Sequence, residues 1–187
     1  MSVITNAKEL VDWYDNQERI LTPNFLNTIK WEDVKAHPLP EEFIPVIVYF
    51  RDIEKFTEVY FKEMKKTPTG RDPVVRQFME KWQYEEDLHG ELMNRFLEEA
   101  GYPSGEGWFQ KAKKDIPFSY RASEVVNAGL ANLIGKRFSA VHMTWGAINE
   151  MTTLTGYRRL AAAVNHPVLT HILKGIMREE ATHSFFY

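Results

Sequence analysis

Apolar side chains recur along most of this chain at spacings of three and four residues, the pattern that buries one face of an amphipathic helix. Between positions 73 and 100, for example, Phe78, Trp82, Met93 and Phe96 share one stripe. No segment alternates apolar and polar residues with the two-residue period of a strand, and the β-branched residues are scattered. The pattern therefore predicts an all-α protein.

Capping residues, prolines and glycines divide this pattern into five helical segments. They are predicted at Ala7–Leu21, Glu41–Met64, Asp72–Ala100, Ser123–Val164 and from Pro167 to the C-terminus. The expected N-caps are Asn6, Asp72 and Ser123, the expected left-handed C-cap is Gly101, and Pro45 falls in a first turn. The fourth segment is long for one globular helix, so a break is expected near Gly129 or Gly135. The stretch Tyr102–Tyr120 is expected to be irregular.

One short motif, Glu-x-x-His, occurs twice. It appears as Glu86 and His89 in the third predicted helix, and as Glu180 and His183 in the fifth. Residues three apart share a helix face, so each helix can direct a carboxylate and an imidazole at one point. A single copy usually lies on a solvated face. Both copies here lie within apolar stripes, which predicts that they face the core.

Two other helices each place a glutamate on an apolar face. Glu54 shares its face with Ile47, Phe50 and Phe61, and Glu150 shares its face with Met143, Gly146 and Ala147. Glu58, one turn after Glu54, is the alternative in its helix. Four buried carboxylates without partners would each cost several kcal/mol or take up a proton. Two divalent cations would neutralise all four, and two neutral imidazoles would add no charge.

This combination predicts a ferritin-like four-helix bundle with an additional N-terminal helix. One Glu from each of two helices, with Glu-x-x-His from each of the other two, is the ligand set of the di-iron proteins in that group. Oxygen-rich ligation favours iron, with manganese as the alternative, over zinc or copper. The predicted metal ligands are Glu54, Glu86, His89, Glu150, Glu180 and His183. Glu85 and Glu179, which precede two of them, are expected either to support the ligands or to face solvent.

The chain is predicted to be a single domain over residues 1–187, with an N-terminal extension at 1–38 and the di-iron bundle at 39–187. It contains no cysteine, which excludes disulfides, zinc–thiolate sites and cysteine nucleophiles. A net charge of −3 argues against a general nucleic-acid binder. The polar N-terminus and the absence of a long apolar run predict a cytoplasmic protein without a membrane span.

The residues around these ligands resemble the ligand segments of the soluble acyl-carrier-protein desaturases. The first is LPEEFIPVIVYFRDIEKF, whose register places Glu54 rather than Glu58 at the ligand position. The second is WQYEEDLHGELMNRFLEEAG, and the third and fourth lie in INEMTTLTGYRRLAAAVNHPVLTHILKGIMREEATHSFFY. The resemblance covers Leu39 to Tyr187. Chains of that family continue well past their fourth ligand helix, so a chain ending at Tyr187 is expected to be C-terminally truncated or a reduced relative.

The resemblance implies an O2-dependent di-iron enzyme that removes two hydrogens from an acyl chain bound to acyl-carrier protein or another acyl carrier. It also implies a ferredoxin-type electron donor and a homodimer. Thr153 falls where the family has a threonine linked to oxygen handling, although such a hydroxyl often bonds back to its own helix. Trp82 is expected either to donate to a ligand or to pack in the core.

Three other readings of the same ligand set remain open. The protein could be a different di-iron oxygenase, either a hydroxylase or an N-oxygenase. It could be a ferritin-like ferroxidase or iron store, which would assemble into a much larger particle than a dimer. It could also be a helical scaffold that keeps the pattern without metal. Pocket shape, particle mass and metal content distinguish these classes.

Overall fold

The computed structural model describes residues 4–187, apart from the side chains of residues 118, 120–122, 124 and 125 within one helix. Residues 1–3 of the predicted N-terminal extension lie outside the described part. All regular secondary structure from residue 4 to residue 187 is helical, so the predicted all-α class is confirmed. Within that range no helix is both long and apolar enough to cross a bilayer.

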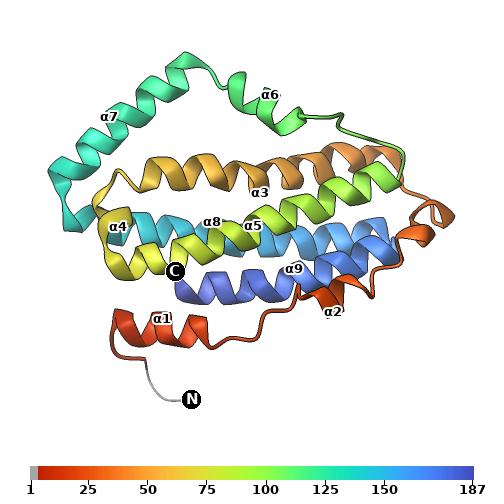
Figure 1. Ribbon diagram of the computed structural model, residues 1–187, viewed down its shortest axis with the longest axis horizontal. Helices are drawn as coiled ribbons and strands as arrows, with labels where there is room; N and C mark the ends of the chain where they lie inside the picture. The colour runs from red at the N-terminus through yellow and green to blue at the C-terminus, as the bar shows by residue number, and fades with distance from the viewer. Residues whose placement is uncertain (1–3) are drawn as a thin grey trace.

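Four long helices form the bundle: α3 (Ile44–Met64), α5 (Pro73–Glu99), α8 (Lys136–Val164) and α9 (Pro167–Phe186). Figure 1 shows that α3 and α5 run antiparallel, as do α8 and α9, and that a long crossover returns the chain from the end of α5 to the start of α8. Two antiparallel pairs joined by one crossover is the connectivity of ferritin-like bundles.

The crossover contains more helix than predicted. It comprises α6 (Trp108–Lys114) and α7 (Phe118–Ile134), which lie outside α3 in Figure 1. The prediction of an irregular Tyr102–Tyr120 stretch was therefore wrong, and Ser123 lies inside α7 rather than at its N-cap. Glycine or proline occupies positions 101, 103, 105, 107 and 117 and interrupts the helical pattern of this stretch. The apolar periodicity that predicts a helix is therefore hard to detect there.

Other predicted boundaries agree with the structure. Asn6 and Asp72 accept backbone N–H bonds as N-caps of α1 (Ala7–Asp15) and α5. Gly101 follows α5 with φ 94°, and Gly135 separates α7 from α8 with φ 69°. Both values favour glycine because a Cβ would clash with the backbone there. The predicted break in the fourth segment is thus at Gly135, not at Gly129.

The first helix ends earlier than predicted, at Asp15 rather than Leu21. The backbone N–H groups of Ile20 and Leu21 bond to the side chain of Glu179 on α9 instead of to helix carbonyls. Short helical pieces not predicted from sequence complete the N-terminal half: α2 (Pro23–Leu26), 3-10 turns at Trp31–Ala36 and Glu41–Phe43, and α4 (Pro68–Arg71).

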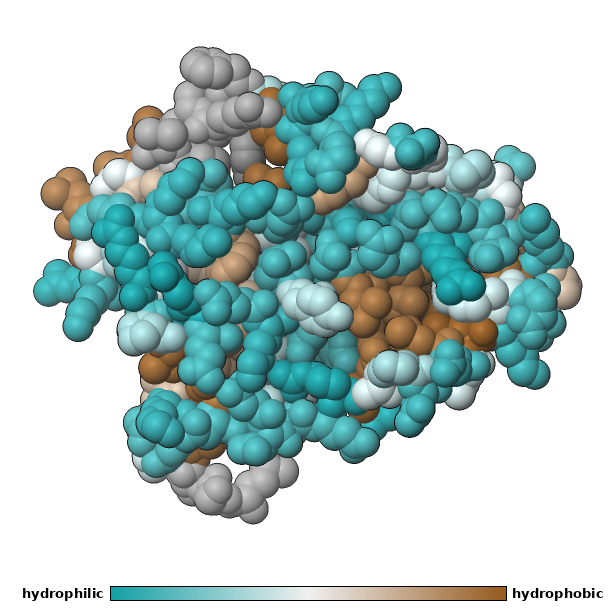
Figure 2. Space-filling model, in the orientation of Figure 1, coloured by the Kyte–Doolittle hydropathy of each residue, from teal (hydrophilic) through white to brown (hydrophobic). Residues whose placement is uncertain are grey.

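The core consists of two apolar clusters at different levels of the bundle. One includes Ile47, Phe96, Ile172 and Ile176, and the other includes Phe61, Phe78 and Phe186. Between the two clusters, α3, α5 and α9 each bury ionisable side chains, which include Glu54 on α3, Glu86 and His89 on α5, and Glu180 and His183 on α9. Hydrophilic side chains cover most of the face seen in Figure 2, with apolar side chains visible in its right half between α5 and α9. The bundle therefore encloses a polar layer between two apolar ones.

Candidate metal centre

The structure brings all six predicted ligands into this polar layer. Each of the four long helices supplies one of the carboxylates, and α5 and α9 add the imidazoles. The exposed fractions are 6% or less in every case: Glu54 2%, Glu86 3%, His89 0%, Glu150 6%, Glu180 0% and His183 0%. Glu58 instead pairs with Lys62 and Lys113 away from the layer. Glu54 is therefore the α3 carboxylate that joins the cluster.

The six residues form two groups of four whose ligand atoms lie within 4.8 Å of one another. One group is Glu54, Glu86, His89 and Glu180, and the other is Glu86, Glu150, Glu180 and His183. Glu86 and Glu180 belong to both groups, whereas each remaining residue belongs to one. Two metal ions held by these groups would share Glu86 and Glu180, and each would have one further carboxylate and one imidazole of its own.

The two imidazoles point the same nitrogen at the cluster. Nδ1 of His89 lies 3.1 Å from Oε1 of Glu180, and Nδ1 of His183 lies 2.8 Å from Oε1 of Glu86. Although the atoms of each pair are close, the angles between them are not those of a hydrogen bond. Both Nδ1 atoms, Oε1 of Glu86 and both carboxylate oxygens of Glu180 are buried without a hydrogen-bond partner. Buried polar atoms are rarely left unpaired, so a concentration of five at one point fits a divalent cation.

The electrostatics of the protein without metal show why the cluster needs cations. Burial raises the pKa of Glu86, and the charges on Glu180 and Glu54 raise it further. Burial and Glu180 likewise raise the pKa of Glu150. Burial alone would lower the pKa of His89, but the carboxylates of Glu179 and Glu180 outweigh it and raise that pKa well above its usual value. Without metal, protons would have to supply the positive charge that balances these carboxylates.

Each imidazole is held from outside by a carboxylate of the opposite helix. Nε2 of His183 lies 2.8 Å from Oε2 of Glu85, and Nε2 of His89 lies 3.0 Å from Oε2 of Glu179. With the Nε2 protons donated to these carboxylates, the Nδ1 lone pairs face the metal positions. Such partners fix the tautomer and raise the basicity of a metal-binding histidine. Glu85 and Glu179 therefore support the ligands and do not face solvent.

The two carboxylates that belong to single groups also have fixed partners. Nε1 of Trp82 donates to Oε1 of Glu150 at 2.9 Å, which is the ligand-donor role expected for this residue. The hydroxyl of Tyr157 donates to Oε1 of Glu54. Burial and the charge on Glu54 raise the pKa of Tyr157 well above its usual value, so its hydroxyl stays protonated and can donate.

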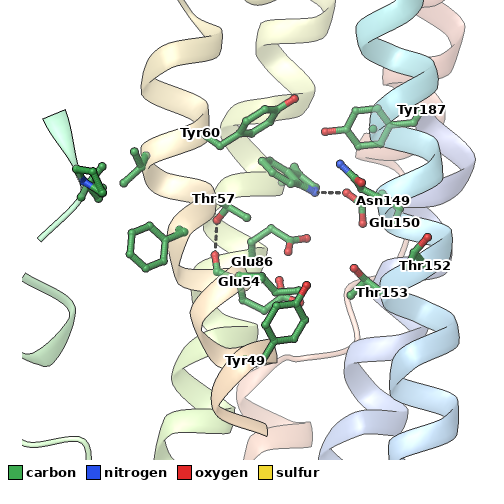
Figure 3. A pocket seen from close by; sticks show the side chains of 17 residues that line it. Tyr49, Glu54, Thr57, Tyr60, Glu86, Asn149, Glu150, Thr152, Thr153 and Tyr187 are labelled. Atoms are coloured by element: carbon green, nitrogen blue, oxygen red, sulfur yellow. Dashed lines mark hydrogen bonds between the residues drawn. The ribbon is translucent and has the colours of Figure 1, made fainter. Parts of the chain in front are cut away.

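A cavity of about 600 Å³ adjoins the cluster between α3 and α8. Its wall includes the carboxylate-bearing residues Glu54, Glu86 and Glu150, and Figure 3 shows the first two projecting from one side and Glu150 from the other. Thr153 lies on the α8 side, and its hydroxyl makes no hydrogen bond to the described part of the chain. By contrast, the hydroxyls of Thr152 and Thr155 bond back to their own helix.

Sequence reasoning missed Tyr157 and left the role of the two outer glutamates open. The sequence contains a pattern that indicates the role of the two glutamates and another that indicates the role of Tyr157. Glu85–Glu86 and Glu179–Glu180 are the same doublet placed identically before each histidine, as Glu-Glu-x-x-His. Tyr157 lies seven residues after Glu150 and so shares its helix face. The other histidines (His37, His142, His166 and His171) lie outside both groups of ligands.

Comparison with known proteins found no matching family model, no similar curated protein and no similar solved structure. The likeness to the acyl-carrier-protein desaturases thus stays a prediction from motifs. The structure itself establishes an all-helical protein with a buried glutamate and histidine cluster that resembles a carboxylate-bridged di-metal site.

Proposed function

We propose that this protein is a di-iron oxidoreductase that uses O2 to desaturate a long acyl chain presented by acyl-carrier protein or another acyl carrier. The observation that carries the proposal is the cavity whose wall contains three carboxylates of the cluster. A cavity in the range of about 300–1,000 Å³ suits an organic ligand. A ferroxidase or iron store needs only an entry path for ions, so the cavity favours chemistry on an organic substrate.

The composition of the cavity wall fits an apolar chain lying beside the metal positions. Apolar and aromatic side chains, including Ile53, Phe56, Val59 and Ile116, line the part of the wall that the glutamates, threonines and Asn149 do not. Bound iron would supply the capacity to reduce O2 and oxidise an unactivated C–H bond. The protein itself would bind the chain, exclude water and hold the carboxylates in place through Trp82 and Tyr157.

Thr153 is the residue we assign to handling protons on the cavity side. Its hydroxyl borders the same cavity as Glu150, and it is not bonded back to its helix as its neighbours are. A hydroxyl in this place can donate to or accept from an oxygen species that binds at the cavity. Its position one turn after Glu150 keeps it on the helix face that points at the cluster.

The proposed partners are an acidic acyl carrier, a ferredoxin-type electron donor and a second copy of the chain. Homodimerisation would cover an exposed apolar stripe on α8 formed by Val141, Trp145, Ile148 and Met151. Apolar stripes of this kind on a soluble protein are often interaction surfaces. The basic residues that would face an acidic carrier include Lys65, Lys66 and Arg71, which lie between the end of α3 and the start of α5; Lys66 would have to exchange its ion pair with Glu63.

The first test is metal content and an optical spectrum after loading with Fe²⁺ and exposure to air. Two irons per chain and a near-ultraviolet oxo-to-iron band are expected. Reduced protein is then given O2 and acyl-carrier-protein thioesters, and products are analysed by mass spectrometry. Loss of two hydrogen atoms identifies a desaturase, whereas gain of one oxygen atom would reassign the protein as a hydroxylase. Iron uptake into a many-subunit particle without substrate oxidation would make it an iron store.

A further inference from the structure

The N-terminal extension reaches the back of the metal centre. The segment Tyr14–Leu21, which covers the end of α1 and the non-helical residues after it, lies against both outer carboxylates, Glu85 and Glu179. These carboxylates are separated by 94 positions in sequence (179 minus 85) and belong to different helices. One short segment thus contacts the outer partners of both metal-facing histidines.

On the α5 side, the segment holds both oxygens of Glu85. The hydroxyl of Tyr14 donates to Oε2 at 2.5 Å, the same oxygen that lies 2.8 Å from Nε2 of His183. Nε of Arg19 lies 2.5 Å from Oε1, and the guanidinium group lies 4.3 Å from the centre of the Tyr14 ring. Tyr14 is fully buried, so its hydroxyl has no water with which to exchange this bond.

On the α9 side, the segment uses its backbone. The N–H groups of Ile20 and Leu21 donate to Oε1 of Glu179 at 3.0 and 2.9 Å, while Oε2 lies 3.0 Å from Nε2 of His89. Glu179 is 4% exposed. Each outer carboxylate therefore has one oxygen beside its histidine and the other held by the N-terminal segment, which leaves neither carboxylate free to rotate.

We infer that Tyr14–Leu21 is a positioning element that sets the orientation of both metal-facing imidazoles through Glu85 and Glu179. The inference rests on the proposed metal centre. A histidine whose outer partner is fixed presents Nδ1 in one direction and in one tautomer. If the segment were absent, both carboxylates could turn toward solvent, and each imidazole would lose the bond that orients it.

An ordinary packing role makes a different prediction. Tyr14 also packs edge-to-face against Phe78 and Phe186, so its ring contributes to the core whatever its hydroxyl does. Tyr14→Phe keeps the ring and removes only the hydroxyl. If Tyr14 serves only to pack, this variant should bind metal like the unaltered protein.

The experiment is a titration of the full chain with Co²⁺ alone, followed by visible absorption. Outer partners of metal-binding histidines typically change affinity about 10–100-fold; Tyr14 acts one bond further out, so we expect Tyr14→Phe to weaken binding roughly 3–10-fold. The absorption band of the bound Co²⁺ should also shift, because the imidazole geometry changes. Tyr84→Phe is the matched control, since this hydroxyl is next to Glu85 in sequence but its side chain is exposed.

A double-mutant cycle separates positioning from general destabilisation. In a Glu85→Gln background, Tyr14→Phe should have much less effect on Co²⁺ binding, because residues that act through one another are not additive. Equal effects in both backgrounds, or an unshifted absorption band in Tyr14→Phe, would overturn the positioning role while leaving the metal centre intact. Failure of the unaltered protein to bind Co²⁺ or Fe²⁺ would overturn both proposals.

Discussion

Glutamine in place of Glu179 would put a donor where the native side chain offers only acceptors. The two carboxylate oxygens face opposite sides: Oε2 faces Nε2 of His89, and Oε1 accepts from the backbone N–H groups of Ile20 and Leu21. An amide has one oxygen and one NH2 group, so it cannot accept hydrogen bonds on both sides. The substitution changes almost no volume, which isolates this electronic effect.

Each orientation of the amide has a cost. If the amide turns its NH2 group toward His89, this group and the N–H at Nε2 of His89 are two donors that face each other. The imidazole can avoid this only by moving its proton to Nδ1, the atom directed at the metal position. If the NH2 group instead faces Ile20 and Leu21, the buried N–H group of Leu21 and the half-buried N–H group of Ile20 lose their acceptor, at about 1–3 kcal/mol for a buried group. We therefore expect Glu179→Gln to weaken metal binding about 10–100-fold, which corresponds to about 1.4–2.7 kcal/mol.

The assay is calorimetric titration with Fe²⁺ under nitrogen, together with thermal unfolding of the metal-free protein. Glu58→Gln is the control, because Glu58 is a glutamate on α3 that pairs with Lys62 and Lys113 away from the cluster. Native affinity in Glu179→Gln would refute the reasoning about the outer carboxylates. An equal loss of affinity in Glu58→Gln would show that the effect is not specific to the cluster.

Further substitutions and a pH titration test the ligand assignment and the cavity. His183→Ala or Glu86→Ala should remove iron and leave a folded bundle by circular dichroism, and unchanged iron content in either variant would contradict the ligand assignment. Thr153→Val should retain iron but alter the yield of oxidised product per O2 consumed, whereas loss of iron would mean that Thr153 supports the metal instead. In Gly146→Ala, the new Cβ would lie 2.3 Å from the Tyr187 ring, so the ring must move. Both residues line the cavity, so the preferred length of the acyl chain should change while the iron content does not. Burial and Glu180 raise the pKa values of Glu86 and Glu150, so these carboxyls still hold protons at pH values above the ordinary carboxyl range. Metal uptake must displace these protons, so affinity should rise as the pH increases above that range; a pH-independent affinity would contradict this.

The buried cluster also links metal binding to stability. Four carboxylates and two imidazoles form a polar layer between two apolar clusters, and each of these side chains is 6% exposed or less. Any cation that binds only the folded protein stabilises it by mass action. Fe²⁺ should therefore raise the unfolding temperature of the native protein, and this increase should be absent in His183→Ala.

Local patterns in the sequence predict the helical class, the break in the fourth segment and the composition of the ligand set. These features are local. Helical periodicity needs only residues three and four positions apart, and a glutamate within an apolar stripe must face the core wherever its helix packs. The left-handed conformation at Gly135 likewise depends on the one residue type that adopts it without strain.

Which carboxylates belong to both groups, and what holds the ligands in place, depend on how the helices pack. Glu85 reaches His183 across 98 positions, Tyr157 reaches Glu54 across 103, and Leu21 reaches Glu179 across 158. Periodicity along one helix carries no information about such pairings, because they depend on how the helices are rotated and shifted against one another. The end of α1 at Asp15 has the same origin, since Glu179 on α9 takes the N–H groups that a longer helix would have used.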